Sequence, residues 1–191
     1  MNKEKLQEAT MLALQSKLVE GDAEIEAELT KYINQEFTRG QIEQIKWGLE
    51  LGLDVSKYAD PKFNYLEMSQ IKDGLEKNLD VSKYADPKFG YMQMQEIKYG
   101  LEDNLDVSKY ADPEFDWKQM HEIRYGLGHN LDVSKYADPS LKSSRMREIR
   151  LGLEDEVDIT PYMNPKSTVD ELHGIRYALT HGFTPPKRDE N

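Results

Sequence analysis

Hydrophobic residues recur at the same offsets every 26 residues along most of the chain. Within each repeat, three apolar columns stand at offsets 0, 3 and 7, which lie on one face of an α-helix. The pattern predicts an amphipathic helix of about 13 residues in each repeat, with this face in a core. The columns are Ile42, Met68, Met94, Met120, Met146 and Leu172; then Ile45, Ile71, Ile97, Ile123, Ile149 and Ile175; then Leu49, Leu75, Leu101, Leu127, Leu153 and Leu179.

The residues before each apolar face predict where the helix begins. Asn64 fits an N-cap with Glu67 as its capping-box partner, and Phe63 and Met68 fit a hydrophobic staple around that cap. Gly90 and Lys142 are weaker caps in the same position, and Ser143 can substitute for Lys142. The equivalent cap pairs in other repeats are Thr38 with Gln41, Asp116 with Gln119 and Thr168 with Glu171.

Glycine and asparagine predict where each helix ends, because these residues tolerate the left-handed conformation after a last turn. The residue that follows is apolar in every repeat, as expected for such a cap. Glu156 is the exception in the glycine and asparagine column, which otherwise holds Gly52, Asn78, Asn104, Asn130 and Gly182.

The octet Asp-Val-Ser-Lys-Tyr-Ala-Asp-Pro follows the helix and occurs four times without change, starting at Asp54, Asp80, Asp106 and Asp132. In the first copy, Asp54 can cap a short second helix over Val55 to Ala59, which Pro61 would end. Val55 and Tyr58 are three residues apart and are expected to face inward.

A long helix and a short helix per repeat cannot bury their apolar faces alone, so the repeats are expected to stack. The predicted fold class is an all-α solenoid with an N-terminal helical cap. The predicted domains are an N-terminal helical cap with a degenerate repeat over 1–37, tandem repeats with a terminal capping helix over 38–184, and a disordered tail over 185–191. Lys5 to Glu20 is expected to form an amphipathic helix within the cap.

A glycine column runs through the middle of the predicted helices, where each glycine costs about 1 kcal/mol relative to alanine. The recurrence indicates a repeated structural reason. The sequence favours the close approach of a neighbouring helix over contact with a ligand. The column holds Gly48, Gly74, Gly100, Gly126 and Gly152.

The composition narrows the classes of partner. The net charge of −11 disfavours nucleic acid and anionic membranes and favours a basic protein. The absence of cysteine excludes disulfides, thiolate metal sites and a cysteine nucleophile. The first twenty residues hold no apolar run that suits a signal peptide or a membrane span, so a cytoplasmic protein is expected.

A column of cations flanks the apolar face at about 65° from its centre. Two interpretations stay open: the cations pair with nearby acids, or they form a ladder that binds anions or nucleic acid. The acidic composition favours pairing. The cations are Lys46, Lys72, Lys98, Arg124, Arg150 and Arg176. The acids expected to pair with them are Asp54, Asp80, Asp106, Asp132, Asp158, Asp60, Asp86, Asp112 and Asp138.

The next column is rich in aromatic residues and points about 165° away from the apolar face. Exposed aromatic residues in a row favour a binding surface, although packing between adjacent helices is the alternative. Asp73 interrupts the column, and its neighbours vary from repeat to repeat, which also suits a partner-specific face. The predicted partner-binding residues are Trp47, Tyr99, Tyr125, Leu151 and Tyr177.

No pattern indicates catalysis, a cofactor or a metal. The octet has oxygen donors at positions 1, 3 and 7, but it lacks the glycine of a calcium loop, so helix capping explains Asp54 and Ser56 better. The histidines are expected to be solvated surface residues, because no further metal ligands or nucleophile accompany them. They are His121, His129, His173 and His181.

The sequence of the repeat reads Leu-Asp-Val-Ser-Lys-Tyr-Ala-Asp-Pro-Lys-Phe, followed by Met, by Ile-Lys or Ile-Arg and by Gly-Leu-Glu. It resembles a known short helical repeat. That repeat occurs in uncharacterised proteins of Gram-positive gut bacteria, their phages and mobile elements. The resemblance covers about Leu29 to Phe183 and implies a helical array and a mobile-element origin, but no activity. The fifth repeat differs from this sequence at Pro161, Met163-Asn164 and Ser167.

Together these patterns predict a non-enzymatic, protein-binding repeat scaffold. An acidic inhibitor of a nucleic-acid-binding or defence protein is the sharper form of this hypothesis. Nucleic-acid or anion binding through the cation column is the alternative.

Overall fold

The computed structural model describes residues 23–33, 36–164 and 166–185, and every regular element in these ranges is helical. The predicted helix over Lys5 to Glu20 and most of the predicted tail lie outside these ranges. The α-helices are α2 Ala23–Ile33, α3 Arg39–Glu50, α4 Tyr65–Glu76, α5 Tyr91–Glu102, α6 Trp117–Gly128, α7 Ser143–Glu154 and α8 Val169–Thr180. The 3-10 helices are η1 Val55–Lys57, η2 Val81–Lys83, η3 Val107–Lys109, η4 Val133–Lys135 and η5 Thr160–Tyr162.

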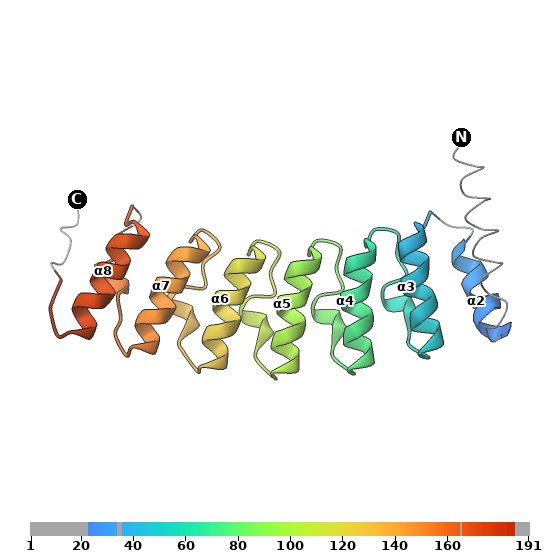
Figure 1. The fold of residues 1–191 in the computed structure, drawn as a ribbon, viewed down its shortest axis with the longest axis horizontal. Helices are drawn as coiled ribbons and strands as arrows, with labels where there is room; N and C mark the ends of the chain where they lie inside the picture. Colours follow the sequence, from blue (N-terminus) through green and yellow to red (C-terminus); the bar gives the residue numbers. More distant parts are fainter. Residues whose placement is uncertain (1–22, 34–35, 165, 186–191) are drawn as a thin grey trace. The chain divides into compact units, whose positions relative to one another are not determined.

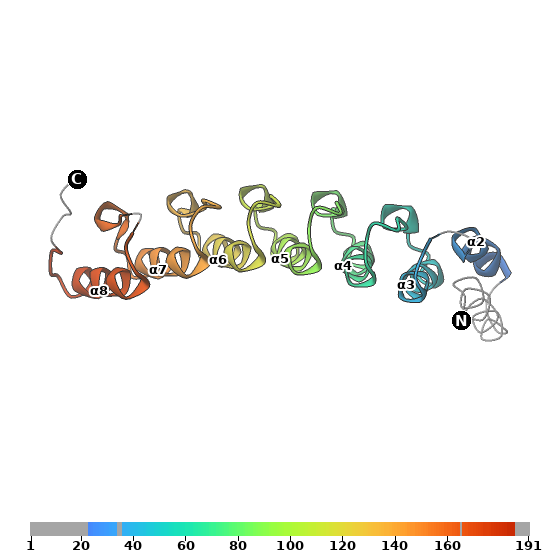
Figure 2. The same cartoon turned by 90° about the horizontal axis from the view of Figure 1, so that it is seen from above.

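The chain forms two compact units, 1–94 and 95–191, and the division falls within α5. In the first unit α2 packs on α3 and α3 on α4; in the second, α6 packs on α7 and α7 on α8 (Figure 1). Within the second unit, the 3-10 helices lie on one side of the layer that these α-helices form (Figure 2). Within the described ranges, no helix is long and apolar enough to cross a membrane.

The predicted helix starts are confirmed. Asn64 accepts hydrogen bonds from the amides of Leu66 and Glu67, and Glu67 accepts one from the Asn64 amide, which completes a capping box. The same reciprocal capping box stands at the start of α3, α6 and α8, with Thr38, Asp116 and Thr168 as the N-cap residues. Lys142 makes no side-chain cap, as its weaker chemistry predicts.

The predicted helix ends are confirmed as well. Asn78, Asn104 and Asn130 have φ between 55° and 57°, and Gly52 and Gly182 also have positive φ. After α3, the Leu53 amide donates to the Gly48 carbonyl and the Gly52 amide to the Leu49 carbonyl, which is the pairing of a Schellman cap. The cap satisfies carbonyls that the helix end would otherwise leave without partners.

Glu156 adopts the same left-handed conformation, with φ of 60°, without the chemistry that suits it. Replacing Glu156 with glycine is expected to stabilise the protein by about 1 kcal/mol, because a left-handed conformation costs a residue with a Cβ about that much. Denaturant unfolding monitored by circular dichroism measures the difference. As a control, Asn130→Gly should change the free energy of unfolding by less than about 0.5 kcal/mol, because asparagine already tolerates this conformation. A Glu156→Gly variant no more stable than the parent would contradict the strain.

The octet forms a shorter element than predicted. Instead of a helix over Val55 to Ala59, it forms one 3-10 turn over Val55–Lys57, capped by the Asp54 carboxylate through the Ser56 amide. The prediction that Val55 and Tyr58 face inward is confirmed, since both side chains are buried. The 3-10 turn brings the Tyr58 ring back onto the helix of its own repeat.

Each octet tyrosine makes the same bond to that helix. The hydroxyls of Tyr58, Tyr84, Tyr110 and Tyr136 donate to main-chain carbonyls fourteen residues earlier, at 3.0 to 3.2 Å. Burial raises the pKa of Tyr110 well above its ordinary value of about 10. The side chain of Tyr110 is therefore a neutral phenol in the folded protein.

The interpretation of the glycine column is corrected by these tyrosines. A Cβ added at Gly100 would lie 1.9 Å from the Tyr110 hydroxyl and 2.9 Å from a Val107 methyl. Glycine is thus required by the tyrosine of its own repeat rather than by a neighbouring helix. Gly48, Gly74 and Gly126 have equivalent contacts.

The first and last repeats depart from this scheme. Leu29 stands 26 residues before Val55 and is buried like it, but it lies in the α-helix α2 rather than in a 3-10 turn. In the fifth repeat the 3-10 turn starts one residue later, at Thr160, and Gly152 faces Ile159 and the Val157 carbonyl instead of a tyrosine. The substitution of proline at position 161 fits this shift, because proline suits the first turn of a helix.

Candidate functional site

The aromatic column lies on the solvent side of the helices, as predicted. Trp47 is 47% exposed, Tyr99 37%, Tyr125 42% and Tyr177 57%, whereas Leu151 is half-buried. The first two apolar columns of the same helices are buried except for Ile175, and the leucine column is partly buried, so these rings lie outside the core. Trp47 lies in the first unit, and the other four residues lie in the second.

The cation column is less accessible than an anion-binding ladder requires. The side chain of Arg150 is only 9% exposed, and those of Lys72, Arg124 and Arg176 are 12 to 18% exposed. Lys98 is also buried. Lys46 pairs with Glu50 at 3.4 Å on its own helix.

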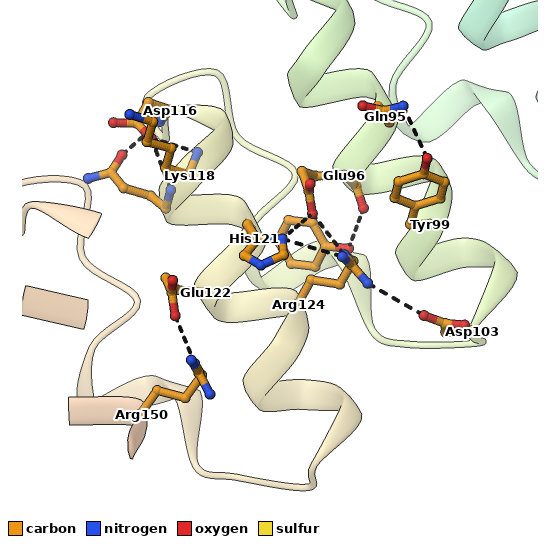
Figure 3. A network of polar contacts seen from close by, with 12 residues as sticks. Gln95, Glu96, Tyr99, Asp103, Asp116, Lys118, His121, Glu122, Arg124 and Arg150 are labelled. Carbon is orange, nitrogen blue, oxygen red and sulfur yellow. Dashed lines mark hydrogen bonds and ion pairs between the residues drawn. The ribbon is translucent and has the colours of Figure 1, made fainter. Parts of the chain in front are cut away.

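Arg124 lies at the centre of a polar network between α5 and α6 (Figure 3). Its Nε donates to Glu96 Oε2 at 2.8 Å, and its Nη1 lies 3.6 Å from Asp103 Oδ2. His121 Nδ1 lies 3.4 Å from both the same Glu96 oxygen and Arg124 Nη2. Arg124 thereby binds one carboxylate on α5, that of Glu96, and one just after the end of α5, that of Asp103.

Arg176 repeats this arrangement two helices later, whereas Arg150 binds one carboxylate of the preceding helix and one of its own helix. Arg150 donates to Glu122 at 2.7 Å and to Glu154 at 2.6 Å. Arg176 donates to Glu148 at 3.2 Å and to Asp155 at 2.8 Å. Burial lowers the pKa of Arg150, but the hydrogen bonds and charges of Glu122 and Glu154 together more than offset this and raise its pKa overall.

The expected acid partners of the cations were therefore wrong for these arginines. Pairing was expected with octet aspartates such as Asp106 and Asp132, but the principal acid is a glutamate 28 residues before each arginine. The first aspartate of each octet instead accepts hydrogen bonds from the octet serine, as Asp106 does from the Ser108 amide at 3.2 Å, and the second accepts one from an amide just after the octet, as Asp112 does from Glu114. Local capping and inter-helix pairing thus use different acids.

The aromatic and cation columns meet in the second unit. The guanidinium carbon of Arg150 lies 4.6 Å from the centre of the Tyr125 ring, and that of Arg124 lies 5.5 Å from the Tyr99 ring. The glutamate that binds each arginine stands three residues before the tyrosine whose ring that arginine covers. We name the set of glutamate, tyrosine and following arginine the Glu–Tyr–Arg cluster; its members are Glu96, Tyr99 and Arg124, and Glu122, Tyr125 and Arg150.

These clusters change the interpretation of two predicted binding residues. Tyr99 and Tyr125 contribute to contacts between helices while they keep an exposed edge. Trp47 and Tyr177 have no arginine over their rings in the part of the chain that the structure describes. The aromatic column therefore combines packing with exposure, and its most accessible rings stand on α3 and α8.

The histidines occupy defined positions but form no metal site. His129 and His181 stack on Tyr125 and Tyr177, with ring centres 4.6 and 4.0 Å apart. The Nδ1 atoms of both histidines lie 2.8 Å from the carbonyls of these tyrosines. No group of three potential metal ligands occurs among the described residues.

Sequence reasoning missed a second set of exposed aromatic residues. Tyr65 and Trp117 each stand at the first position of a helix and are 51% and 39% exposed. Their spacing of two repeats was a visible signal. Also missed were the Gln41 and Gln119 amides, which donate to carbonyls 20 and 22 residues later and tie each helix to the next turn.

The chain was compared with protein-family models, curated proteins and solved structures, and no match was found in any of these comparisons.

Proposed function

We propose that the chain is a non-enzymatic, protein-binding scaffold built as an all-α solenoid of 26-residue repeats with an N-terminal helical cap. Successive helices from α4 to α8 begin 26 residues apart, at Tyr65, Tyr91, Trp117, Ser143 and Val169. Packed consecutive helices within each unit support this architecture. Each unit would present residues from several of its own helices to a partner.

The observation that carries the proposal is the contrast between the two sides of each helix. The buried side is nearly the same in every repeat, whereas the exposed side changes around Trp47 and Tyr177. Large exposed aromatic side chains are the residues that most often anchor protein partners. A scaffold with a constant interior and a varied aromatic face fits protein recognition.

The charge supports a basic partner. The chain has 36 acids against 25 lysines and arginines, so a basic protein would associate with it rapidly at low salt. In its sharper form, the proposal is an acidic inhibitor that covers the basic surface of a nucleic-acid-binding or defence protein. Affinity that falls steeply with salt supports that form, and affinity that salt does not change contradicts it.

Nucleic-acid or anion binding through the cation column is the alternative. The arginine pairs weaken it, because Arg124, Arg150 and Arg176 each lie beside two carboxylates. A phosphate would have to displace these acids. Titration with RNA and DNA at low salt is expected to show no binding, and binding that Arg124→Gln weakens would favour the alternative.

Affinity capture with quantitative mass spectrometry tests the proposal. The parent is compared with a Trp47→Ala/Tyr177→Ala variant, and Tyr65→Ala is the control because it removes an exposed ring at another helix position. We expect basic proteins that the parent and the control retain and that the double variant loses. The same set of captured proteins with all three chains would refute the proposed face.

A further inference from the structure

Two columns of the repeat change together along the chain. The position three residues before the aromatic column is paired in sequence with the cation 28 residues later. Where the first is glutamine the second is lysine, and where the first is glutamate the second is arginine. The pairs are Gln44 with Lys72, Gln70 with Lys98, Glu96 with Arg124, Glu122 with Arg150 and Glu148 with Arg176.

The Glu–Tyr–Arg cluster shows what the glutamate and arginine pair does. In the second unit, the glutamate carboxylate accepts a hydrogen bond from the arginine Nε, and the guanidinium carbon lies 5.5 Å from the Tyr99 ring centre in one cluster and 4.6 Å from the Tyr125 ring centre in the other. A guanidinium can stack on a ring and donate to a carboxylate at once, because its donors lie in the plane of the group. Ring and acceptor together thus form a site for arginine.

On α3 the same site has its ring and its acceptor but no arginine. Gln44 is 7% exposed, and its buried side-chain Oε1 has no hydrogen-bond partner among the residues that the structure describes. Lys72 stands where an arginine would, and it pairs with Asp73 at 3.2 Å and Glu76 at 3.9 Å on its own helix. Within the described ranges no cation lies over the Trp47 ring.

The surroundings of Trp47 suit a cationic side chain. Indole is the aromatic group that attracts cations most strongly. Half-exposed carboxylates stand one turn from Trp47 on α3, at Glu50, and at the equivalent position of the next helix, at Asp73. Leu51 is 51% exposed and extends the apolar surface beside the ring.

We propose that Trp47, with the carboxylates of Glu50 and Asp73, binds an arginine side chain that a basic protein partner supplies. This inference rests on the proposed function, because it names the chemistry of the partner at the same face. The partner's guanidinium stacks on the exposed part of the Trp47 ring, as the guanidinium groups of Arg124 and Arg150 lie over Tyr99 and Tyr125. Lysine fits less well, because its ammonium is compact, strongly hydrated and has no planar face.

Fluorescence of Trp47 tests the proposal directly. The chain has two tryptophans, so a Trp117→Phe background makes Trp47 the sole reporter. The probes are two short peptides of glycine and serine that carry arginine or lysine at every third position. We expect the arginine peptide to quench Trp47 and to bind about five-fold more tightly than the lysine peptide, as a cation–π contact of about 1 kcal/mol implies.

Two further variants separate recognition from folding. Gln44→Glu with Lys72→Arg would complete a cluster over Trp47 within the chain, so binding should weaken about five-fold while stability is kept or raised. Trp47→Ala should weaken binding to the arginine peptide by a similar factor, measured by calorimetry. Tyr125→Ala is the matched control, because Arg150 already covers that ring, and it should leave peptide affinity within about two-fold.

The outcomes distinguish this inference from the broader proposal. Equal affinity for both peptides, with loss in Trp47→Ala, would overturn the assignment to arginine but would support a protein-binding face at Trp47. Peptide binding that neither Trp47→Ala nor the Gln44→Glu/Lys72→Arg variant changes would overturn the site. The capture experiment judges the scaffold function independently, because it requires no particular side chain of the partner.

Discussion

Gly100→Ala is expected to destabilise the protein by about 3 kcal/mol, even though alanine is the better helix former. The added Cβ would lie 1.9 Å from the Tyr110 hydroxyl, so the ring must leave its place and lose its 3.1 Å hydrogen bond to the Glu96 carbonyl. Overpacking costs about 1 to 3 kcal/mol, and a lost hydrogen bond adds about 1 kcal/mol. Urea denaturation of the two proteins measures the loss.

Two controls identify the hydroxyl as the cause. Tyr110→Phe in the Gly100→Ala background removes the clashing oxygen and should restore the free energy of unfolding to within about 1.5 kcal/mol of the parent. Gly174→Ala adds a methyl group where nothing lies within 4 Å and should stabilise the protein by up to about 1 kcal/mol. A Gly100→Ala variant as stable as the parent would show that the octet tyrosine does not require glycine.

Glu122→Leu is expected to destabilise the protein by about 3 kcal/mol, because it leaves the buried guanidinium of Arg150 without its principal acid. Arg150→Leu should cost a similar amount, since Glu122 and Glu154 then lose their cation. The double variant should cost about 2 kcal/mol less than the sum, because replacing both partners leaves no unpaired buried charge. Chemical denaturation of all four proteins gives the coupling energy.

Arg147→Leu provides the control for this cycle. Arg147 is an exposed arginine on the same helix, and its loss should change stability by no more than about 0.5 kcal/mol. If Glu122→Leu and Arg150→Leu proved additive, the pair would contribute nothing as a unit. The Glu–Tyr–Arg cluster would then be a coincidence of neighbouring side chains.

The sequence was sufficient to predict features that a few neighbouring residues determine. The capping box of Asn64 and Glu67 depends only on hydrogen bonds within one turn, and the left-handed Asn78 depends on its own conformational preference. The partial burial of Arg150 also followed from its place on the helix wheel, beside the apolar face. The first two features depend on a few neighbouring residues, and the third depends on the position of Arg150 around its own helix.

Contacts between residues far apart in the chain could not be predicted from the sequence. The pairing of Arg124 with Glu96 depends on which face of α6 meets α5 and at what height, and helical periodicity does not determine either. The reason for Gly100 lies ten residues away in Tyr110, and only the single 3-10 turn brings the two together. Separation of the aromatic column into covered and uncovered rings follows from the same inter-helix geometry.

The 26-residue unit can be copied as a block because the octet tyrosine bonds inside its own repeat. A tandem duplication of the gene segment would carry the glycine, the 3-10 turn and the tyrosine together, so the new copy would fold its own turn without any change in its neighbours. The glutamate and arginine are different, because they lie 28 residues apart and belong to successive copies. A duplicated copy keeps this contact only if both copies have the same chemistry, which accounts for the block of glutamate–arginine repeats that follows the glutamine–lysine repeats.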